Sequence, residues 1–591
     1  MIGFPRTPNR QSGYPWRWWI LALVVEIGLF FLAGSRIRGL LANTLWLILG
    51  TLVISIPLGT VLAILITKTQ IAGRKWLQRL LVSLLLVPLY VQAAAWQAAL
   101  GWGGWLPAWW AAVDPTRQGQ VVWLVGWQGA IWVHAMAAIP WVALLVAVAM
   151  DSLDRELEED AIMHGSWVRV ICRVTLPQAL SGVILASLWI TSVCASEITV
   201  TDLFQIRSFA EEVYTAASLG ELTNATPESP PGQGNQTEEL VSGQALLLGL
   251  PHQQVLSGLE FNPTSTLKDK FDKGLADDFS LWLGTLMLGI LTVTAMATLA
   301  RWYRSERLSG SGWRWQSTRA RWITSWVGWG LVILLAGIPL TSMAWKAGTR
   351  VERDGDQFVR SWSATKLVGA LADTPIKHRR EWGWSFVCGG AVAIAATVCG
   401  TWLAWTLRKR WLPAVPLAIL VAAGFGLPGP VLGVWLIRVL NWPPDSALSF
   451  LTWCYDETLL APMLAQTIRA LPLVTLFLWT QMERVPQNLL DNAASEGAGF
   501  WRQLLYVVLP LRWASLLAAA WLAFIIAIGE LAATVLVSPP GVSTLSIRIF
   551  GLLHYGAEDQ VAALCLTLWL MTGLLTVVVV TFMEIKSAAG R

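Results

Sequence analysis

The sequence predicts an all-α membrane protein of about twelve transmembrane helices, arranged as two similar halves of six. Hydrophobic residues make up 55% of the 591-residue chain, charged residues only 13%, and the mean hydropathy is +0.55. This composition is typical of membrane proteins and argues against a soluble one. Apolar runs recur along the whole chain, and one loop pattern occurs twice. These observations together define the expected fold.

Twelve apolar runs have about the 20 residues that a helix needs to cross a bilayer core about 30 Å thick. In the first half they lie near 16–34, 41–66, 78–100, 128–150, 178–201 and 279–299, and in the second near 322–345, 384–407, 414–440, 461–482, 512–535 and 561–583. The first run is longer than a signal-peptide core, which predicts an uncleaved span. Two prolines in Gly426–Pro430 predict a break or kink in the ninth span.

Basic residues between the runs predict a cytoplasmic N-terminus. They gather in the loops Lys68–Arg79, Arg301–Arg321 and Arg408–Arg410, which all fall inside in that orientation, as the positive-inside rule requires. The long segment from Leu203 to Asp278 then falls outside and carries eleven acidic against four basic residues. Because the positive charges are spread over short loops, the net charge of +5 reflects topology, and we expect no nucleic-acid partner.

The span pattern divides the chain into five regions. These are residues 1–202 with the first five spans, 203–278 as an extracytoplasmic acidic loop, 279–299 as the sixth span, 300–321 as a basic cytoplasmic linker, and 322–591 as the second half. Within the outer loop, Asn224–Glu239 is rich in Pro, Gly, Asn, Gln and Thr, as flexible linkers are. The loop is either an insertion without chemistry or a small module that contacts a partner.

A loop pattern between the fourth and fifth spans returns 333 residues later, between the tenth and eleventh. The copies are residues 159–177 and 491–510, and both end in Leu-Pro at a membrane entry. An acidic residue six positions before Gly165 or Gly497 predicts a helix, a glycine turn and a second helix. Four positions of the second helix form the i, i+3, i+4, i+7 stripe of an amphipathic helix. They are Val168, Ile171, Cys172 and Thr175 in the first copy and Trp501, Leu504, Leu505 and Val508 in the second.

This pattern resembles the EAA loop of ABC importer permeases, whose coupling helices dock into a groove on the ATP-hydrolysing subunit. The second copy follows the family spacing, although Asp491 replaces the usual Glu. The first copy has Asp160 where Ala is usual and one residue fewer between Gly165 and Leu176. The resemblance implies a type I importer permease fold and a set of coupling residues. These are Glu159, Asp160, Ala161, Gly165, Arg169, Leu176 and Pro177 in the first loop, and Asp491, Ala493, Gly497, Arg502, Leu509 and Pro510 in the second.

The chain has no phosphate loop of the form G-x-x-x-x-G-K-[ST]. The resemblance therefore implies a transport subunit that is not an enzyme, served by two copies of an ATP-binding partner that uses ATP and Mg. It also implies an extracytoplasmic solute-binding protein and a multi-pass location in a bacterial inner membrane. The cysteines form no C-x-x-C pair and have no metal-ligand spacing, so we expect no metal site and no cofactor in this chain.

A second feature repeats twenty residues after each Leu-Pro proline. Glu197 and Glu530 stand in apolar runs, and each is followed four residues later by a threonine, Thr201 or Thr534. A carboxylate in a membrane helix is costly and usually faces a bundle interior or an aqueous cavity. These four residues are candidate elements of a translocation path. A structural bond to a neighbouring helix or loop is the equal alternative.

The segments around these glutamates resemble fused permeases for ferric iron and, less closely, thiamine. Ferric iron is accordingly the expected cargo, with thiamine or an oxyanion such as molybdate or sulfate as alternatives. An ion-coupled secondary transporter would also have two repeats. It would need ionisable residues deep in its spans, whereas the clearest candidates here lie near the outer ends. A membrane anchor without transport does not predict two matched loops.

Overall fold

The computed structural model describes residues 35–101, 104–113, 124–151, 155–218, 318–354, 357–409, 424 and 426–589. The expected spans near 16–34 and 279–299 lie outside the described residues. So do the acidic outer loop beyond residue 218, most of the basic linker and the start of the ninth span. Among the described residues, seven helices are long and apolar enough to cross a membrane, or nine if two bent pairs are each counted as one span.

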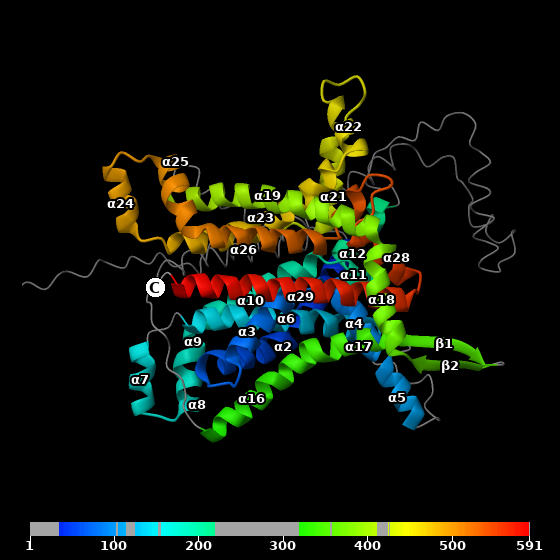
Figure 1. The fold of residues 1–591 in the computed structure, drawn as a ribbon, viewed down its shortest axis with the longest axis horizontal. Helices are drawn as coiled ribbons and strands as arrows, with labels where there is room; N and C mark the ends of the chain where they lie inside the picture. The colour runs from blue at the N-terminus through cyan, green and yellow to red at the C-terminus, as the bar shows by residue number, and fades with distance from the viewer. Residues whose placement is uncertain are drawn as a thin grey trace, which may run out of the picture.

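Each half is built on three packed helices. In the first half these are α2 (Ser35–Lys68), α6 (Gly126–Asp151) and α10 (Leu180–Ser196). In the second they are α19 (Arg379–Lys409), α23 (Leu460–Glu483) and α26 (Leu509–Gly529). Apolar side chains fill the space between the helices of each half, which confirms two helical bundles of the same kind (Figure 1).

A glycine brings two helices into close contact at the same place in both halves. A Cβ added at Gly59 would lie 2.4 Å from Cβ of Val142, and one added at Gly400 would lie 2.9 Å from Cγ1 of Val474. These distances leave no room for a side chain. Small residues allow membrane helices to approach closely, so the repeated glycine aligns α2 with α19 and α6 with α23.

The last helix joins the two halves. α29 (Glu558–Ala589) packs against α3 (Arg74–Leu85) and α4 (Leu89–Leu100) of the first half and against α26 of the second. It lies between the two bundles in Figure 1. The span expected near 322–345 continues through α16 (Thr318–Val332), a π-helical turn η3 (Ile333–Gly337) and α17 (Ile338–Gly348), and α17 also packs on α29. The two halves therefore share one core.

The span expected at 78–100 is not a single helix. It is a bent pair in which α3 is followed by α4 after a break that contains Pro88, and the angle between α3 and the run that begins with α4 is 105°. Proline lacks the N–H that would continue the helix and disfavours helical angles in the residue before it. The break predicted in the ninth span is confirmed, because α21 (Gly429–Leu440) begins directly after Pro428. Both breaks have proline at the N-cap, so they are equivalent points in the two halves.

The end of the molecule away from the repeated loops carries elements that the sequence did not predict. A two-stranded antiparallel hairpin, β1 (Thr349–Asp354) and β2 (Gln357–Trp362), modifies the all-α expectation. The remaining elements there are the helices α5 (Trp105–Val113), α12 (Phe209–Ser218), α18 (Ala364–Lys377), α22 (Ser449–Glu457) and α28 (Leu545–His554). These short helices follow the outer ends of the spans, so the polar outer region is more structured than a set of simple turns.

Candidate coupling loops and translocation cavity

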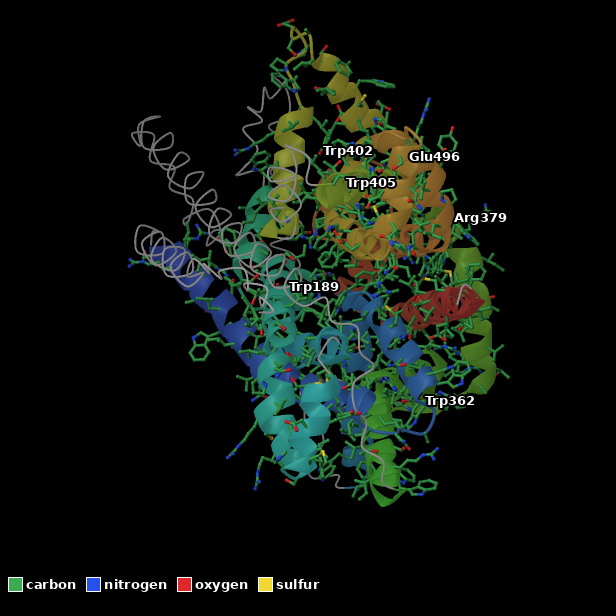
Figure 2. All side chains as sticks on the ribbon, turned by 90° about the vertical axis from the view of Figure 1, so that its left-hand side faces the viewer. Trp189, Trp362, Arg379, Trp402, Trp405 and Glu496 are labelled. Atoms are coloured by element: carbon green, nitrogen blue, oxygen red, sulfur yellow. The ribbon has the colours of Figure 1, made fainter. Side chains whose placement is uncertain are left out.

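The two repeated loops lie at the same end of the molecule and have the same build (Figure 1). The first consists of α7 (Arg155–Met163), α8 (Trp167–Val170), a π-helical turn η2 (Ile171–Thr175) and α9 (Leu176–Gln178). The second consists of α24 (Gln487–Ser495), α25 (Phe500–Gln503) and a π-helical turn η4 (Leu504–Val508) that leads into α26. Figure 2 looks onto this end and shows Glu496 at the surface of the second loop and Trp405 within the bundle.

The π turns correct the predicted amphipathic stripe. Ile171 and Thr175 are buried as predicted, and so are Leu504 and Val508, but the other four positions are exposed: Val168, Cys172, Trp501 and Leu505. A π turn holds one residue more per hydrogen-bonded ring than an α turn and so rotates the following side chains. The buried face instead includes the residue before each turn, Val170 or Gln503. The loops thus keep several apolar side chains at their surface.

Both loops turn between two helices at the predicted glycine, but only the second turn uses a left-handed glycine. Gly497 has φ +82°, a left-handed conformation that costs other residues roughly 1–2 kcal/mol. Gly165 is not among the glycines with positive φ in the described part of the chain. The first loop has one residue fewer after its glycine, and it turns without a left-handed residue there. Gly165 is therefore not required for backbone reasons.

Most predicted coupling residues lie on the surface of the loops. The exposed ones are Glu159, Asp160, Arg169, Pro177, Asp491, Gly497, Arg502 and Pro510, and the half-buried ones are Ala161, Gly165, Leu176, Ala493 and Leu509. Apolar side chains accompany them, with Met163 84% exposed and Trp501 56% exposed. A surface that combines charges with exposed apolar groups on two short helices is suited to bind another protein.

Among the described residues, a buried ion pair attaches the first loop to its bundle but not the second. Nζ of Lys68, at the end of α2, lies 2.7 Å from the carboxylate oxygens of Glu158 in α7, and Thr175 Oγ1 donates to the same carboxylate at 2.8 Å. Both charged side chains are buried, with exposed fractions of 2% and 1%. In the second loop the equivalent positions are apolar, Leu490 and Val508, and both are buried. The loops therefore have the same fold but different anchors.

The lysine of the second half makes a different contact. Lys409, at the end of α19, donates from Nζ to Oε1 of Gln503 at 2.7 Å and lies over the Trp405 ring, with Nζ 5.0 Å from its centroid. Indole Nε1 of Trp405 donates to the carbonyl of Phe500 at 3.2 Å. The second loop is thus held by a neutral acceptor and an aromatic ring rather than by a buried carboxylate.

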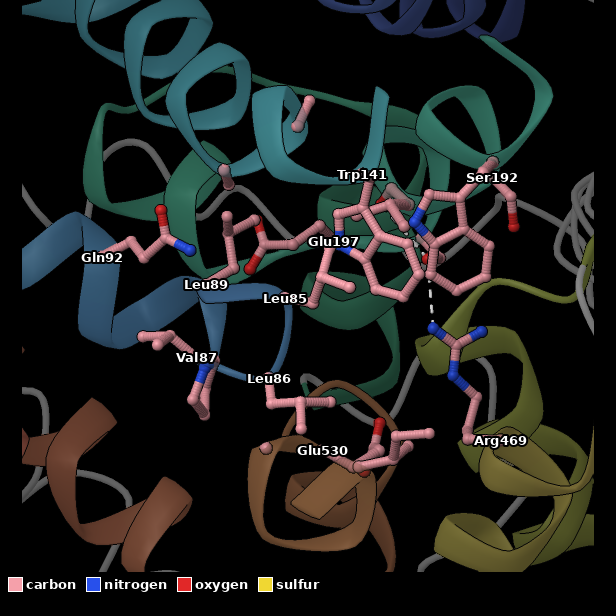
Figure 3. Close-up of a pocket in the computed structure, with 18 of the residues that line it drawn as sticks. Leu85, Leu86, Val87, Leu89, Gln92, Trp141, Ser192, Glu197, Arg469 and Glu530 are labelled. Atoms are coloured by element: carbon pink, nitrogen blue, oxygen red, sulfur yellow. Dashed lines mark hydrogen bonds between the residues drawn. The ribbon is translucent and has the colours of Figure 1, made fainter. Parts of the chain in front are cut away.

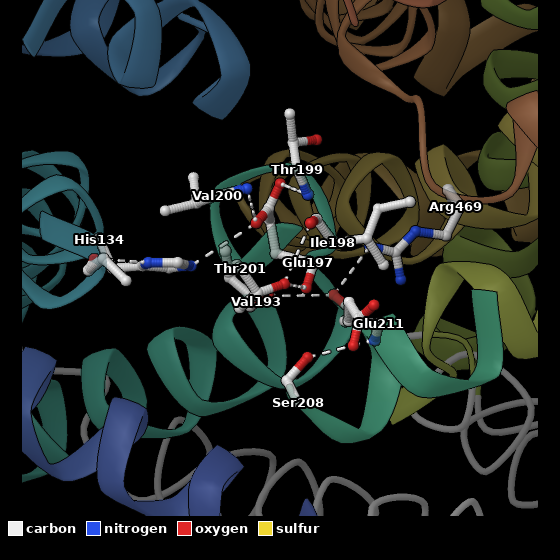
Figure 4. Close-up of polar contacts among 12 residues, drawn as sticks. His134, Val193, Glu197, Ile198, Thr199, Val200, Thr201, Ser208, Glu211 and Arg469 are labelled. Atoms are coloured by element: carbon white, nitrogen blue, oxygen red, sulfur yellow. Dashed lines mark hydrogen bonds and ion pairs between the residues drawn. The ribbon is translucent and has the colours of Figure 1, made fainter. Parts of the chain in front are cut away.

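The two repeated glutamates cap short helices in matching positions. α10 ends at Ser196, Glu197 is extended, and its carboxylate accepts from the backbone N–H groups of Thr199 and Val200 at 2.8 and 2.9 Å (Figure 4). These N–H groups begin α11 (Thr199–Leu203). A carboxylate at a helix N-terminus satisfies donors that have no partner within the helix. The span predicted to reach residue 201 therefore ends five residues earlier, in a capped break.

The second half repeats this cap. α26 ends at Gly529, and the Glu530 carboxylate accepts from the N–H groups of Ala533 and Thr534, both at 2.9 Å. The Thr534 hydroxyl also donates to it, and α27 (Thr534–Val537) follows. Thr201 instead donates to the carbonyl of Ile198 at 3.0 Å. Both threonines are fully buried.

Both glutamates line a cavity of about 260 Å³ between the halves (Figure 3). The break at Pro88, the last turns of α10 and α26 and the middle of α23 form its walls. Trp141 and Trp189 cover one side, with ring centroids 4.6 Å apart. Thr201 and Thr534 are not among the lining residues. The breaks in the helices thus converge on one chamber, as they do where membrane proteins form a pathway.

The sequence interpretation missed Arg469, a basic side chain that lines this cavity. Arg469 lies nine residues into α23, which corresponds to about 14 Å from the start of that helix at 1.5 Å per residue. Its Nη1 donates to the carbonyl of Leu427 at 2.9 Å and its Nη2 to Oγ of Ser196 at 3.2 Å. The clearest candidates chosen from the sequence lie near the outer ends of their spans, and Arg469 adds an ionisable residue well inside a predicted span. An arginine inside the apolar run 461–482 was the available signal.

His134 also borders the cavity and was not selected from the sequence. Its Nε2 lies 3.8 Å from Oε2 of Glu197, and its Nδ1 lies 2.8 Å from the carbonyl of Ala130 (Figure 4). Gln92 of α4 lines the opposite side (Figure 3). The chamber therefore combines an apolar wall with a few polar groups contributed by both halves, which is the usual composition of a small-solute site.

Comparison with known proteins agrees with this arrangement. Residues 55–204 match the family described as binding-protein-dependent transport system inner membrane component. The putative 2-aminoethylphosphonate transport system permease protein of Salmonella paratyphi A is 29% identical over 209 residues, which cover 32% of this chain and 69% of the relative. The same protein of Salmonella typhimurium is 28% identical with the same coverage. The putrescine transport system permease protein of Escherichia coli K12 is 21% identical over 240 residues, 40% of this chain and 84% of the relative.

The matched region begins within α2 and ends after α11, so it contains the first repeated loop, Glu197 and most of the residues that line the cavity. The second half supplies an equivalent set of helices, a second loop and a second capped glutamate. The family match and the permease relatives thus agree with the paired loops, and this part of the chain is similar to the membrane permease subunits of ABC importers.

Proposed function

We propose that this chain forms both halves of a permease that admits a solute to the cytoplasm by alternating access, with ATP hydrolysed by a separate subunit. One observation carries the proposal. The helices that end at the capped glutamates of the cavity, α10 and α26, begin at the two repeated loops. A movement imposed on either loop is thus transmitted along the helix that follows it to the chamber between the halves.

The loops are the proposed docking sites for two copies of the ATP-binding subunit. Exposed charged residues of the predicted coupling set, such as Glu159 and Arg502, stand beside exposed apolar side chains. Each loop would insert into one copy of the partner. The π turns support a role in coupling, because such turns occur often at functional sites in helices. An extracytoplasmic binding protein would deliver the cargo at the opposite end, where the hairpin and α22 lie.

A small charged organic solute is the proposed cargo. The relatives are named for transport of 2-aminoethylphosphonate and putrescine, and the cavity is apolar on one side with an arginine and two glutamates in its wall. We favour an aminophosphonate-like solute, because Arg469 provides a cation for an acidic group. Identification of the ligand that the partner binding protein retains after purification would test this choice.

Ferric iron remains the competing prediction, with thiamine, molybdate and sulfate as further alternatives. The described residues contain no group of three or more His, Cys, Asp and Glu side chains that could hold a metal ion. A permease that receives its cargo from a binding protein needs no permanent metal site, so this observation leaves iron as a prediction. If the purified binding protein retains ferric iron, iron becomes the proposed cargo in place of an organic solute.

Replacement of Gly497 with Trp tests the coupling role of the loops. Gly497 has φ +82° and no atom within 4 Å of an added Cβ, so the substitution strains the turn by roughly 1–2 kcal/mol and adds bulk only at the surface. We expect the protein to remain in the membrane but to lose ATP-driven uptake and binding of the ATPase. Co-purification with the ATPase and uptake into proteoliposomes measure these effects.

Gly165→Ala is the matched control, because Gly165 needs no left-handed angle and an added Cβ would meet only ordinary contacts beginning at 3.5 Å. It should change uptake less than twofold. Normal uptake and ATPase binding by the Gly497→Trp protein would count against a coupling function of the second loop.

A further inference from the structure

The cavity between the halves retains unused hydrogen-bonding capacity. A guanidinium has five N–H donors, and within the described part of the chain Arg469 uses two of them, on Leu427 and Ser196. Nε2 of His134 is buried and has no hydrogen-bond partner among the described residues. Buried polar groups without partners are costly, so these groups indicate a ligand with polar atoms of its own.

Carboxyl groups from both halves line the same cavity as Arg469. Glu197 and Glu530 line the same chamber, and each carboxylate accepts two backbone N–H groups. An ionised carboxylate has about four lone-pair sites. Acceptor capacity therefore remains after the helix caps are formed, even at Glu530, which also accepts from Thr534. The chamber can receive a cationic group beside these carboxylates and an anionic group beside the arginine.

The cavity volume also limits the ligand. At about 260 Å³ it lies below the range of about 300–1,000 Å³ typical of sites for drug-sized molecules. A solute with a short chain between its charged groups fits this volume. A bare metal cation would be repelled by the positive charge of Arg469. A compact diamine would provide no anionic group to pair with the guanidinium.

We infer that this cavity binds the cargo itself during transport, as a small zwitterion. Its oxyanion group, a carboxylate or phosphonate, pairs with Arg469, and its ammonium group lies beside Glu197 and Glu530. The inference rests on the proposed function and names the chemical class of its cargo. Arg469 then recognises the acidic group, because a guanidinium presents donors in the planar geometry that oxyanions accept.

The internal repeat makes it possible to place the guanidinium at the equivalent position of the other half by substitution. Pro140 in α6 and Pro472 in α23 are equivalent, as are Val142 and Val474 opposite the repeated glycines. The same spacing pairs Arg469 with Ala137, and both residues line the cavity. The double variant Arg469→Gln/Ala137→Arg therefore returns a guanidinium to the chamber from the other half.

The experiment compares three matched probes on the purified full-length permease by calorimetry: 2-aminoethylphosphonate, ethylphosphonate and ethylamine. The wild type should bind the zwitterion most tightly. Arg469→Gln should weaken binding of both phosphonates at least about tenfold and leave ethylamine within twofold, since one charge-assisted pair is lost. Arg469→Lys should recover part of the loss, and the double variant should bind the phosphonates more tightly than Arg469→Gln alone.

Unchanged phosphonate binding by Arg469→Gln would overturn the inference. An equal loss for all three probes would also overturn it, because that result indicates a structural role for the bonds to Leu427 and Ser196. Uptake by proteoliposomes with the ATPase and binding protein is measured in parallel. If the wild type takes up no solute when ATP is supplied, the proposed function fails, whatever the calorimetry shows. If uptake occurs but the permease alone binds no zwitterion, only the present inference fails.

Discussion

Replacement of Lys68 with Met should destabilise the first coupling loop by about 3–5 kcal/mol, the cost of removing one partner from a buried ion pair. The Glu158 carboxylate would lose the ammonium 2.7 Å away and keep its bond from Thr175. We expect α7 to detach from the end of α2 and ATP-driven uptake to fall at least tenfold. Hydrogen exchange of residues 155–163 and uptake in proteoliposomes measure the two effects.

The second half offers the control for this experiment. Lys409→Met removes an equivalent lysine whose partner, Gln503, is neutral, so the expected loss is smaller, about 1.5–3 kcal/mol, because no buried charge is left without its partner. The double variant Lys68→Met/Glu158→Leu reproduces the apolar anchor that the second loop has at Leu490. It should recover most of the stability, because an apolar pair can replace a buried ion pair at little cost. Failure of the double variant to recover, or equal losses for Lys68→Met and Lys409→Met, would contradict the anchoring role.

Glu530→Ala should lower stability by about 2–4 kcal/mol, because it leaves two buried backbone N–H groups without an acceptor. These are the N–H groups of Ala533 and Thr534, which begin α27. The helix that follows the break, α27, would lose its N-terminal cap, and the part of the cavity wall formed by this break would become less ordered. Thermal unfolding in detergent should show the lower stability, and uptake in proteoliposomes should be nearly abolished.

Glu197→Ala is the comparison within the same chain. Its carboxylate caps α11 in the same way, although the threonine four residues later, Thr201, donates to the carbonyl of Ile198 and not to this carboxylate. We expect a smaller loss of stability than for Glu530→Ala. If both alanine variants unfold at the wild-type temperature, the caps do not define the breaks, and the two glutamates have another role.

Much of the organisation could be predicted from local sequence because the signals that carry it are local. The composition of an apolar run such as 461–482 is enough to predict a membrane span. The helix α23 covers that run to within one residue at each end. The repeated loops and glutamates were visible as repeats, since a duplicated pattern needs no knowledge of the fold. The bend at Pro88 was missed although a proline marks it, because prolines within membrane helices are also compatible with continuous spans, as Pro140 is in α6.

The sequence by itself therefore determined that this protein crosses a membrane in two related halves, each with a copy of the repeated loop and a glutamate at a fixed distance from it. Only the tertiary structure decided what these residues do. Lys68 meets Glu158 across 90 residues of chain, and Arg469 meets Ser196 across 273. No local pattern records such pairs, because they depend on how helices pack and on which side chains remain buried. The interpretation of the two glutamates changed for the same reason. The sequence shows them as carboxyl groups within apolar runs, and the structure shows them as helix caps that line a shared cavity.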